Sequence, residues 1–450
     1  MKTKTIEQIN ERIKKGKAVV VTAEEMTEIV RKVGEKRAFK EIDVVTTATF
    51  GAMCSTGVFL NFGHSDPPIK MTKVWLNDVP AYTGIAAVDA YIGATEPSEK
   101  FHIKYGGAHV IEDLVRGRKI KLRAEAYGTD CYPRKKIETV ITLEELNQAI
   151  MLNPRNAYQR YNAAINSSRK TLYTYMGKLL PEMSNISFSG SGELSPLMND
   201  PDFETIGRGT RIFLGGTAGY IVGSGTQHSP ETGFATLMVT GDLKKMSPEF
   251  LRAATFEGYG CTLYVGLGIP IPVLNEGLAR KTGISDEEIF TSIIDYGVPS
   301  RNRPLIKRVS YKELKSGFVE IDGKKVRTSP LSSLYLARKV ALILKEKIES
   351  GEFLLSMPVE RLSLKGVIRP LMEKTEKAEI SVRIEPSIPE NKKIVKDESI
   401  CIHCGQCLSL CPLGLFTRDE NWKIVLEPDS CNGCGLCADA CPLKALNVRL

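Results

Sequence analysis

Eight of the chain's eleven cysteines lie in its last fifty residues, in two copies of one spacing. The first copy runs from Cys401 to Pro412 and the second from Cys431 to Pro442, and each reads C-x2-C-x2-C-x3-C-P. Glycines within these loops allow the backbone to wrap closely around a bound group. A segment this rich in cysteine is expected to fold around whatever its thiols bind.

The duplicated spacing predicts two 4Fe–4S clusters, because bacterial two-cluster ferredoxins have the same run. In those proteins the fourth cysteine of each copy binds the cluster held by the other copy. Zinc sites and disulfide frameworks also use paired cysteines. Neither accounts for so regular a duplication with a proline after each final cysteine. The predicted ligands of cluster I are Cys401, Cys404, Cys407 and Cys441. Those of cluster II are Cys431, Cys434, Cys437 and Cys411. We therefore expect this chain to move electrons one at a time.

The length of 450 residues exceeds a single ordinary core, so two or three domains are expected. The segment 384–393 is polar and punctuated by prolines, which is typical of a linker. We predict a catalytic body at 1–380, a linker at 381–395 and a small ferredoxin-like domain at 396–450 that holds both clusters.

Helical and strand patterns alternate before the linker, which indicates an α/β (mixed α+β) body whose strand order the sequence leaves open. Thr22–Glu25 is a capping box that opens a helix, and 332–350 is a long amphipathic helix. The segments 41–50 and 119–127 alternate as strands do. Thr142–Glu145 predicts the start of one more helix.

The formal charge of +8 is distributed unevenly along the chain. Residues 396–450 hold five Lys or Arg against seven Asp or Glu, a net of −2, so the remainder carries +10. This asymmetry favours an acidic electron-transfer module that docks on a basic body, and it favours anionic substrates. A nucleic-acid-binding surface would need a basic stripe with interleaved aromatics, which the sequence lacks.

The beginning of the chain has no apolar run of the kind that a secretory signal contains. No segment approaches the roughly twenty apolar residues that a membrane helix needs. Metal-binding thiols stay reduced in the cytoplasm, where we therefore expect this protein.

The three remaining cysteines differ in setting. Cys261 sits in an apolar, glycine-rich run, and we expect a packed core thiol there. Cys54 follows a predicted strand, in a turn that leaves its thiol near free backbone N–H groups, and such a position activates a nucleophile. Cys131 repeats the arrangement after the second strand. A purely structural role in two tight turns is the alternative.

Common catalytic motifs, including Walker A, H-E-x-x-H and G-x-G-x-x-G, are missing. His64 and Asp66 are candidate proton carriers, although a solvent-facing loop is the simpler interpretation. Ser168–Lys170 is a candidate carboxylate-binding segment. Glycine clusters that can cradle an anion or form tight turns lie at 190–192, 207–209, 215–219 and 223–225.

Residues 1 to about 375 resemble the homocysteine-biosynthesis family, the L-aspartate semialdehyde sulfurtransferases of anaerobic archaea and bacteria. The resemblance rests on four segments, FGAMCSTG at 50–57, GTDCYP at 128–133, NSSRKTLYTYMG at 166–177 and GTRIFLGGTAG at 209–219. It implies that Cys54 and Cys131 are the functional cysteines. It also implies a ferredoxin-type electron donor, often a separate polypeptide with an extra small ligand-binding domain. Here the ferredoxin segment is fused directly, without that extra domain or a tandem nucleotide-sensing module.

The implied reaction converts aspartate semialdehyde and sulfide into homocysteine with two electrons, and a persulfide donor is the alternative sulfur source. We hypothesise that Cys54 accepts sulfur from the persulfide donor and carries it as a persulfide that reacts at the aldehyde carbon. Cys131 then forms a disulfide with Cys54, which the ferredoxin module reduces. An upstream low-potential donor is expected to supply the electrons. The sequence does not decide whether the protein forms a homo-oligomer. The alternatives are another 4Fe–4S-dependent oxidoreductase acting on a carbonyl or sulfur compound, and a non-catalytic electron-transfer subunit.

Protein isolated without oxygen should contain about eight iron and about eight acid-labile sulfide per chain, because two cubanes require that number. Cys434→Ser should damage cluster II and leave the body folded, since the predicted linker separates the two cores. Iron and sulfide analysis combined with circular dichroism tests both statements. A global loss of folding in this variant would contradict the independence of the domains.

Overall fold

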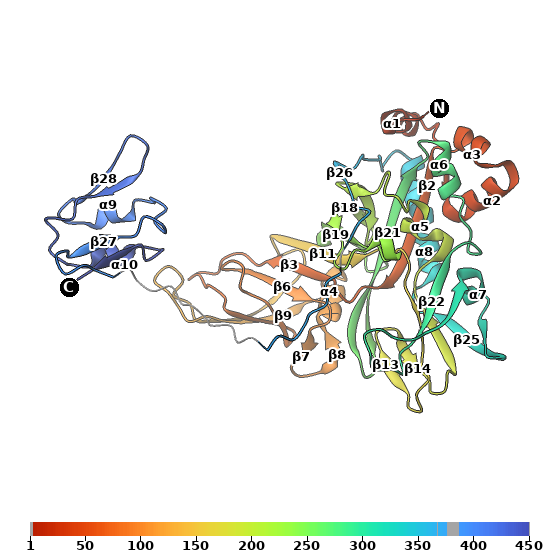
Figure 1. Cartoon of the computed structure of the whole chain (residues 1–450), viewed down its shortest axis with the longest axis horizontal. Helices are drawn as coiled ribbons and strands as arrows, with labels where there is room; N and C mark the ends of the chain where they lie inside the picture. Colours follow the sequence, from red (N-terminus) through yellow and green to blue (C-terminus); the bar gives the residue numbers. More distant parts are fainter. Residues whose placement is uncertain (1–2, 367, 376–386, 450) are drawn as a thin grey trace. The chain divides into compact units, whose positions relative to one another are not determined.

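The computed structural model describes residues 3–366, 368–375 and 387–449 (Figure 1). The chain divides into two compact units, Met1–Arg369 and Pro370–Leu450. Part of the predicted linker, residues 381–386, lies outside the described residues. No helix in the described part of the chain is long and apolar enough to span a membrane.

A ten-stranded mixed sheet organises the first unit. Its two long strands, β2 (Val44–Ala52) and β21 (Gly260–Pro272), are antiparallel neighbours and nearly fully buried, as their β-branched and apolar residues require. The expected strand at 41–50 is therefore confirmed as β2. The order is β1 (Val20–Thr22), β2, β21, β17 (Arg211–Leu214), β18 (Thr217–Ser224), β19 (Leu237–Asp242), β11 (Gln148–Asn156), β3 (Gly57–Asn61) and β6 (Asp89–Gly93), with β20 (Leu251–Phe256) paired to β21.

Helix α8 (Leu334–Glu349) packs on one face of β2 and β21, and it confirms the helix expected at 332–350. The contact is close because β21 presents glycine there: a Cβ on Gly268 would lie 3.0 Å from Val340. On the opposite face, alternate apolar residues of β21 join the core that includes α4 (Gly107–Val115). Both faces of these two strands are thus covered.

Helices α1 (Ile6–Lys14), α2 (Ala23–Val33) and α3 (Glu35–Glu41) begin the chain, and α3 contacts α6 (Glu276–Lys281) (Figure 1). The predicted capping box is confirmed at α2. Glu25 donates its backbone N–H to the Thr22 hydroxyl, and Thr22 donates its own to the Glu25 carboxylate. The helix ends at Gly34, whose φ of 76° suits a residue without a side chain.

A four-stranded antiparallel sheet contains β10 (Lys136–Ile141), β9 (Ile120–Glu125), β4 (Lys73–Leu76) and β5 (Val79–Ala81) in that order. Strand β9 confirms the strand expected at 119–127. The helix expected to start at Thr142 is wrong. Glu145 does accept hydrogen bonds from the Thr142 backbone and hydroxyl, at 2.7 and 2.9 Å, but only a turn follows. The chain enters β11 at Gln148, because pairing with β3 and β19 outweighs the local helix signal.

A six-stranded sheet completes the first unit. It contains two parallel pairs, β12 with β22 and β15 with β25. The order is β23 (Leu305–Ser310), β22 (Phe290–Asp295), β12 (Ala163–Ile165), β15 (Asn185–Phe188), β25 (Lys324–Pro330) and β24 (Phe318–Ile321). A separate hairpin of β13 (Leu172–Thr174) and β14 (Gly177–Leu179) lies between β12 and β15 in sequence. The body is therefore a mixed α/β structure.

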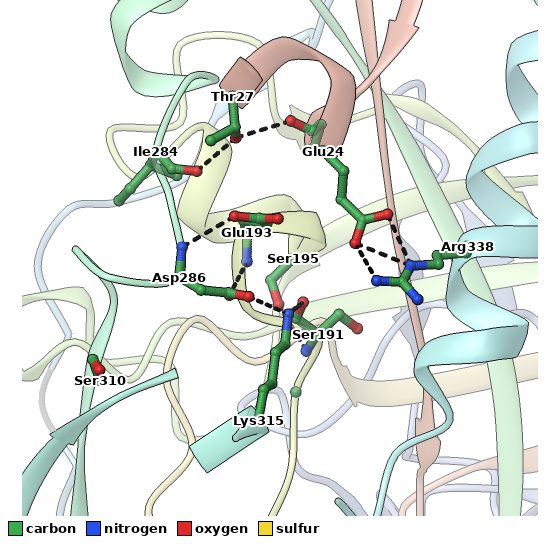
Figure 2. A network of polar contacts seen from close by, with 12 residues as sticks. Glu24, Thr27, Ser191, Glu193, Ser195, Ile284, Asp286, Ser310, Lys315 and Arg338 are labelled. Carbon is green, nitrogen blue, oxygen red and sulfur yellow. Dashed lines mark hydrogen bonds and ion pairs between the residues drawn. The ribbon is translucent and has the colours of Figure 1, made fainter. Parts of the chain in front are cut away.

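Two sets of charged side chains link neighbouring segments of the first unit, one joining the segment after β15 to Asp286 and α7 and the other joining α2 to α8 (Figure 2). Glu193 and Asp286 accept each other's backbone N–H groups, at 3.1 and 2.9 Å. Lys315 of α7 (Tyr311–Lys315) lies 2.6 Å from Asp286, and Arg338 of α8 pairs with Glu24 of α2 through both ends of its guanidinium. Burial, together with the neighbouring Asp286 carboxylate, raises the pKa of Glu193.

The second unit contains two short helices of the same length, and each lies in a segment that carries cysteines. These helices are α9 (Gln406–Leu410) and α10 (Leu436–Ala440). Each begins after a glycine in the left-handed conformation, Gly405 with φ 84° and Gly435 with φ 79°, where a larger side chain would be strained. Two small antiparallel strand pairs accompany them, β27 (Ile394–Lys396) with β30 (Leu446–Val448) and β28 (Phe416–Arg418) with β29 (Ile424–Leu426).

Lys315→Met should lower the free energy of unfolding of the first unit by about 1–3 kcal/mol, because two partly buried carboxylates would face each other without their cation. The loss should grow as the pH rises above 4.5, the ordinary pKa of a glutamate. A raised pKa means that Glu193 stabilises the fold while protonated, and this contribution disappears as the pH rises through that pKa. Thermal unfolding followed by circular dichroism measures both effects. Lys325→Met, at an exposed position, is the control, and equal losses in the two variants would contradict the assignment.

Candidate functional site

A cavity of about 630 Å³ lies between residues of the ten-stranded sheet and residues of the six-stranded sheet. Its wall contains one cysteine, three arginines and five tyrosines, and no Asp or Glu is present among the described residues that line it. The ionisable lining residues are Cys54, Arg155, Arg301, Arg303, Tyr158, Tyr161, Tyr175, Tyr259 and Tyr296. The cavity is therefore suited to a small anion next to a thiol.

Cys54 enters the cavity from the turn between β2 and β3. The Thr262 hydroxyl donates a hydrogen bond to its sulfur at 3.3 Å, and the Tyr259 hydroxyl lies 3.9 Å from the same atom. Thr262 belongs to β21 and Tyr259 to the turn before it, so the pairing of β2 with β21 brings both hydroxyls to the thiol. These contacts hold the sulfur of Cys54 in a defined position in the wall of the cavity.

The tyrosines extend from Cys54 across the cavity. The rings of Tyr259 and Tyr175 are 6.1 Å apart, and the Tyr175 and Tyr296 hydroxyls share a hydrogen bond of 2.7 Å. Burial raises the pKa of Tyr158 to about 12 and also raises the pKa values of Tyr259 and Tyr296. The hydroxyls of Tyr158, Tyr259 and Tyr296 therefore remain protonated at neutral pH and are available as hydrogen-bond donors.

Arg155 is held on the Cys54 side of the cavity. Asn153 accepts a hydrogen bond from the Arg155 backbone at 3.0 Å and one from the hydroxyl of Ser55, the neighbour of Cys54, at 3.5 Å. The Arg155 guanidinium donates to the Thr226 hydroxyl at 3.0 Å. No ion pair involving this arginine occurs within the described ranges, so its charge is available to a ligand.

Arg301 and Arg303 come from the loop after β22. The Arg303 guanidinium stacks over the Tyr296 ring at 4.0 Å, and its buried Nε has no hydrogen-bond partner among the described residues. Buried Asp295 holds the base of this loop by accepting N–H groups from Ser167 and Gly297, at 2.9 and 2.7 Å. Sequence reasoning missed these arginines, although R-x-R in a proline-containing loop directly after a strand was a usable signal.

Cys131 does not line the cavity. It is exposed in the loop between β9 and β10, with the Thr129 hydroxyl 3.5 Å from its sulfur. The next residue, Tyr132, stacks on His64 with ring centroids 5.8 Å apart. Because His64 follows β3 and Cys54 precedes it, the two thiols lie toward opposite ends of a strand that spans roughly 13 Å. The structure does not bring Cys54 and Cys131 together.

The other residues that the sequence singled out lie elsewhere. His64 and Asp66 lie in the loop that contacts the Cys131 segment, and Ser168–Lys170 do not line the cavity. The glycine clusters lie partly in turns, where Gly190, Gly192, Gly209, Gly215 and Gly216 have positive φ, and partly in β18, which contains Gly219 and Gly223. Cys261 is confirmed as a core thiol: it is 1% exposed, its thiol donates to the Ile103 carbonyl at 3.0 Å, and burial raises its pKa.

The cysteines of the second unit surround two separate hollows. One is lined by Cys401, Cys404, Cys407 and Cys441. The other is lined by Cys411, Cys431, Cys434 and Cys437. Burial raises the pKa of the Cys407 thiol, and that of Cys437 to about 11. Four thiols around a mostly apolar hollow are a donor set that fits a 4Fe–4S cube.

A single metal ion needs its ligands closer together than a cube does. Among the described residues, no group of three or more His, Cys, Asp or Glu is arranged to hold such an ion.

Comparison with known proteins covers both units. Residues 18–355 match the family described as homocysteine biosynthesis enzyme, sulfur-incorporation, and residues 393–442 match the 4Fe-4S dicluster domain. The chain belongs to the homocysteine biosynthesis enzyme family. It is thus an enzyme with an iron–sulfur domain at its C-terminal end. No solved structure matches this chain.

Two similar proteins are each named L-aspartate semialdehyde sulfurtransferase. The one from Methanosarcina acetivorans is 58% identical over 373 residues, which cover 83% of this chain and 75% of that protein. The one from Methanocaldococcus jannaschii is 56% identical over 418 residues, or 88% of this chain and 82% of that protein. An uncharacterized protein from Methanothermobacter thermautotrophicus is 31% identical over 324 residues, or 70% of this chain and 72% of that protein.

Thr262→Val should slow alkylation of Cys54 by iodoacetamide about five-fold at pH 7, because the sulfur loses a hydrogen bond worth about 1 kcal/mol that holds it in place. Mass spectrometry that resolves labelling at each cysteine gives the rate. Thr255→Val on the paired strand β20 is the matched control, since the Thr255 hydroxyl bonds to the Ile103 carbonyl and not to Cys54. The same labelling rate in both variants would show that Thr262 does not act on the thiol.

Proposed function

We propose that this enzyme converts L-aspartate semialdehyde to L-homocysteine by reductive sulfur insertion at Cys54. The observation that carries this proposal is a lone thiol in a cavity whose arginines have no carboxylate partner in the lining. An aldehyde that carries a carboxylate matches both features. The names of the two similar proteins from Methanosarcina and Methanocaldococcus support the same substrate.

The carboxylate of the substrate is proposed to bind Arg155. Only a few bonds separate this carboxylate from the aldehyde carbon, so the cation that binds it must lie near the reacting thiol. Asn153 links Arg155 to the neighbour of Cys54 and so places a guanidinium on that side of the cavity. A guanidinium is the preferred partner of a carboxylate because its fork makes two parallel hydrogen bonds.

The chemistry balances when one aldehyde R–CHO, one hydrogen sulfide, two electrons and two protons give one thiol R–CH2–SH and one water. Sulfide adds to the aldehyde, and loss of water leaves a thioaldehyde. The Cys54 thiol adds across its C=S bond, forming the new S–S and C–H bonds of a mixed disulfide R–CH2–S–S–Cys54. Two electrons and two protons then release homocysteine and the Cys54 thiol. Tyr259, which stays protonated, is the proposed donor of hydrogen bonds to the carbonyl oxygen and to the departing water.

The second unit is proposed to hold two 4Fe–4S clusters in a ferredoxin-like fold over 396–450, on the cysteine sets that line its two hollows. Such clusters supply electrons singly at low potential. An upstream low-potential reductant in the cytoplasm would feed them. A mixed disulfide on Cys54 needs no second thiol in the cavity, so we propose that Cys131 assists by resolving it only when its exposed loop moves.

Cys54→Ser should abolish homocysteine formation and leave iron content and reducibility intact, because a serine hydroxyl forms no disulfide. The assay contains anaerobically reconstituted enzyme, sulfide, aspartate semialdehyde and a low-potential reductant. Cys131→Ser should lose less activity than Cys54→Ser, and Cys261→Ser, the matched control outside the cavity, should mainly cost stability, about 1–3 kcal/mol.

Wild-type turnover by Cys54→Ser would refute the proposed role of this thiol. Equal turnover of unrelated aldehydes by the wild type would favour a broader 4Fe–4S-dependent oxidoreductase.

A further inference from the structure

Aspartate semialdehyde occupies less than half of the cavity. It has about eight non-hydrogen atoms, and at about 30 Å³ each, the share of one molecule in liquid water, it needs about 240 Å³. The cavity has a volume of about 630 Å³. Hydrosulfide, with its single non-hydrogen atom, adds little. The remaining space is large enough for a second organic ligand beside the aldehyde.

The positive charges of the cavity fall into two groups. Arg155 lies on the Cys54 side, because Asn153 accepts hydrogen bonds both from the Arg155 backbone and from the hydroxyl of Ser55, the neighbour of Cys54. Arg303 lies with Tyr296, over whose ring its guanidinium stacks at 4.0 Å. The two groups are supplied by different sheets, since Arg155 is in β11 and Arg303 follows β22. One small carboxylate bound at Arg155 leaves the second group without a partner.

The second group is preorganised for an anion. Stacking on Tyr296 fixes the plane of the Arg303 guanidinium, and its buried Nε has no acceptor among the described residues. Arg301 is exposed two residues earlier in the same loop and also lines the cavity. Buried Asp295 fixes the start of this loop, and a Cβ on Gly297 would come within 2.7 Å of the Ser168 backbone nitrogen. Neither Arg301 nor Arg303 makes an ion pair with another described residue, so both charges are available to an anion in the cavity.

We propose that Arg301 and Arg303 form a second anion subsite, which binds the carboxylate of a small persulfide, R–S–SH, that donates sulfur to Cys54. This inference rests on the proposed function, because it assigns the sulfur donor of the same reaction. A persulfide is favoured over hydrosulfide because only an organic donor uses both the spare volume and the second pair of charges. Its sulfur must reach Cys54, the one thiol in the described lining.

The transfer step needs no external electrons. The Cys54 thiolate attacks the outer sulfur of R–S–SH, the donor S–S bond breaks, the Cys54–S–SH bond forms, and R–S⁻ leaves. The persulfide then adds to the aldehyde, and four electrons with four protons release homocysteine, water and the Cys54 thiol. The low-potential reductant that serves the sulfide reaction provides them. A persulfide donor therefore consumes twice as many electrons per homocysteine as sulfide does.

Kinetics of the holoenzyme with two matched donors test the subsite. The donors are the persulfides of 3-mercaptopropionate, which carries a carboxylate, and of 2-mercaptoethanol, which is neutral. The wild-type KM should be at least ten-fold lower for the carboxylated donor, and four electrons should be consumed per homocysteine. Arg303→Gln should remove this preference, whereas Arg155→Gln should raise chiefly the KM for aspartate semialdehyde. Arg169→Gln, an exposed arginine outside the lining, is the matched control.

Arg303→Lys keeps the charge and should restore part of the preference, which separates loss of binding from misfolding. Equal KM values for the two donors in the wild type would overturn the proposal, as would an Arg303→Gln effect confined to the KM for aspartate semialdehyde.

Calorimetric titration of 3-mercaptopropionate separates this proposal from the proposed function, because it needs no turnover. Weaker binding of 3-mercaptopropionate to Arg303→Gln than to wild type supports the subsite, whether or not homocysteine forms. Absence of homocysteine with both donors would refute the proposed function but not the subsite. Equal binding to both proteins overturns the subsite.

Discussion

The antiparallel pairing of β2 with β21 is the interaction on which the site depends. It runs from Val44 opposite Pro272 to Ala52 opposite Tyr264, and helices and apolar side chains cover it on both faces. Because the register is fixed over this whole length, the turn that follows β2 always meets the same residues of β21. Cys54 is thereby held beside Thr262 and Tyr259. A shift of one residue would turn every side chain of β2 to the opposite face.

The chemistry of the cavity follows both from the arginines and tyrosines in its wall and from the absence of Asp and Glu in the described lining. With arginines and protonated tyrosines but no Asp or Glu in the described lining, the wall stabilises negative charge. A carboxylate, a thiolate and the oxygen of an aldehyde under attack are all species of that kind. Stacking and hydrogen bonds fix these donors before a ligand arrives, so little reorganisation opposes the reaction.

Particular residues show where sequence reasoning reached its limit. The capping box at Thr22 predicted a helix correctly, whereas the similar signal at Thr142 did not, because long-range pairing of β11 took over the following residues. Cys54 and Cys131 occupy matching turns in sequence, yet only Cys54 faces the cavity. The arginines at 155, 301 and 303 could not be grouped from their spacing, since distant segments of the chain contribute them.

The sequence by itself determined the two cysteine sets of the C-terminal unit as candidate cluster ligands, the α/β character of the body, and the thiol at 54 as a candidate nucleophile. These features are local: a short loop, a strand period or a turn carries each one. Only the tertiary structure decided which cations and hydroxyls surround that thiol. It also placed Cys131 away from the cavity that these groups line. Those neighbours come from separate sheets, and their approach is fixed by strand register and core packing over hundreds of residues.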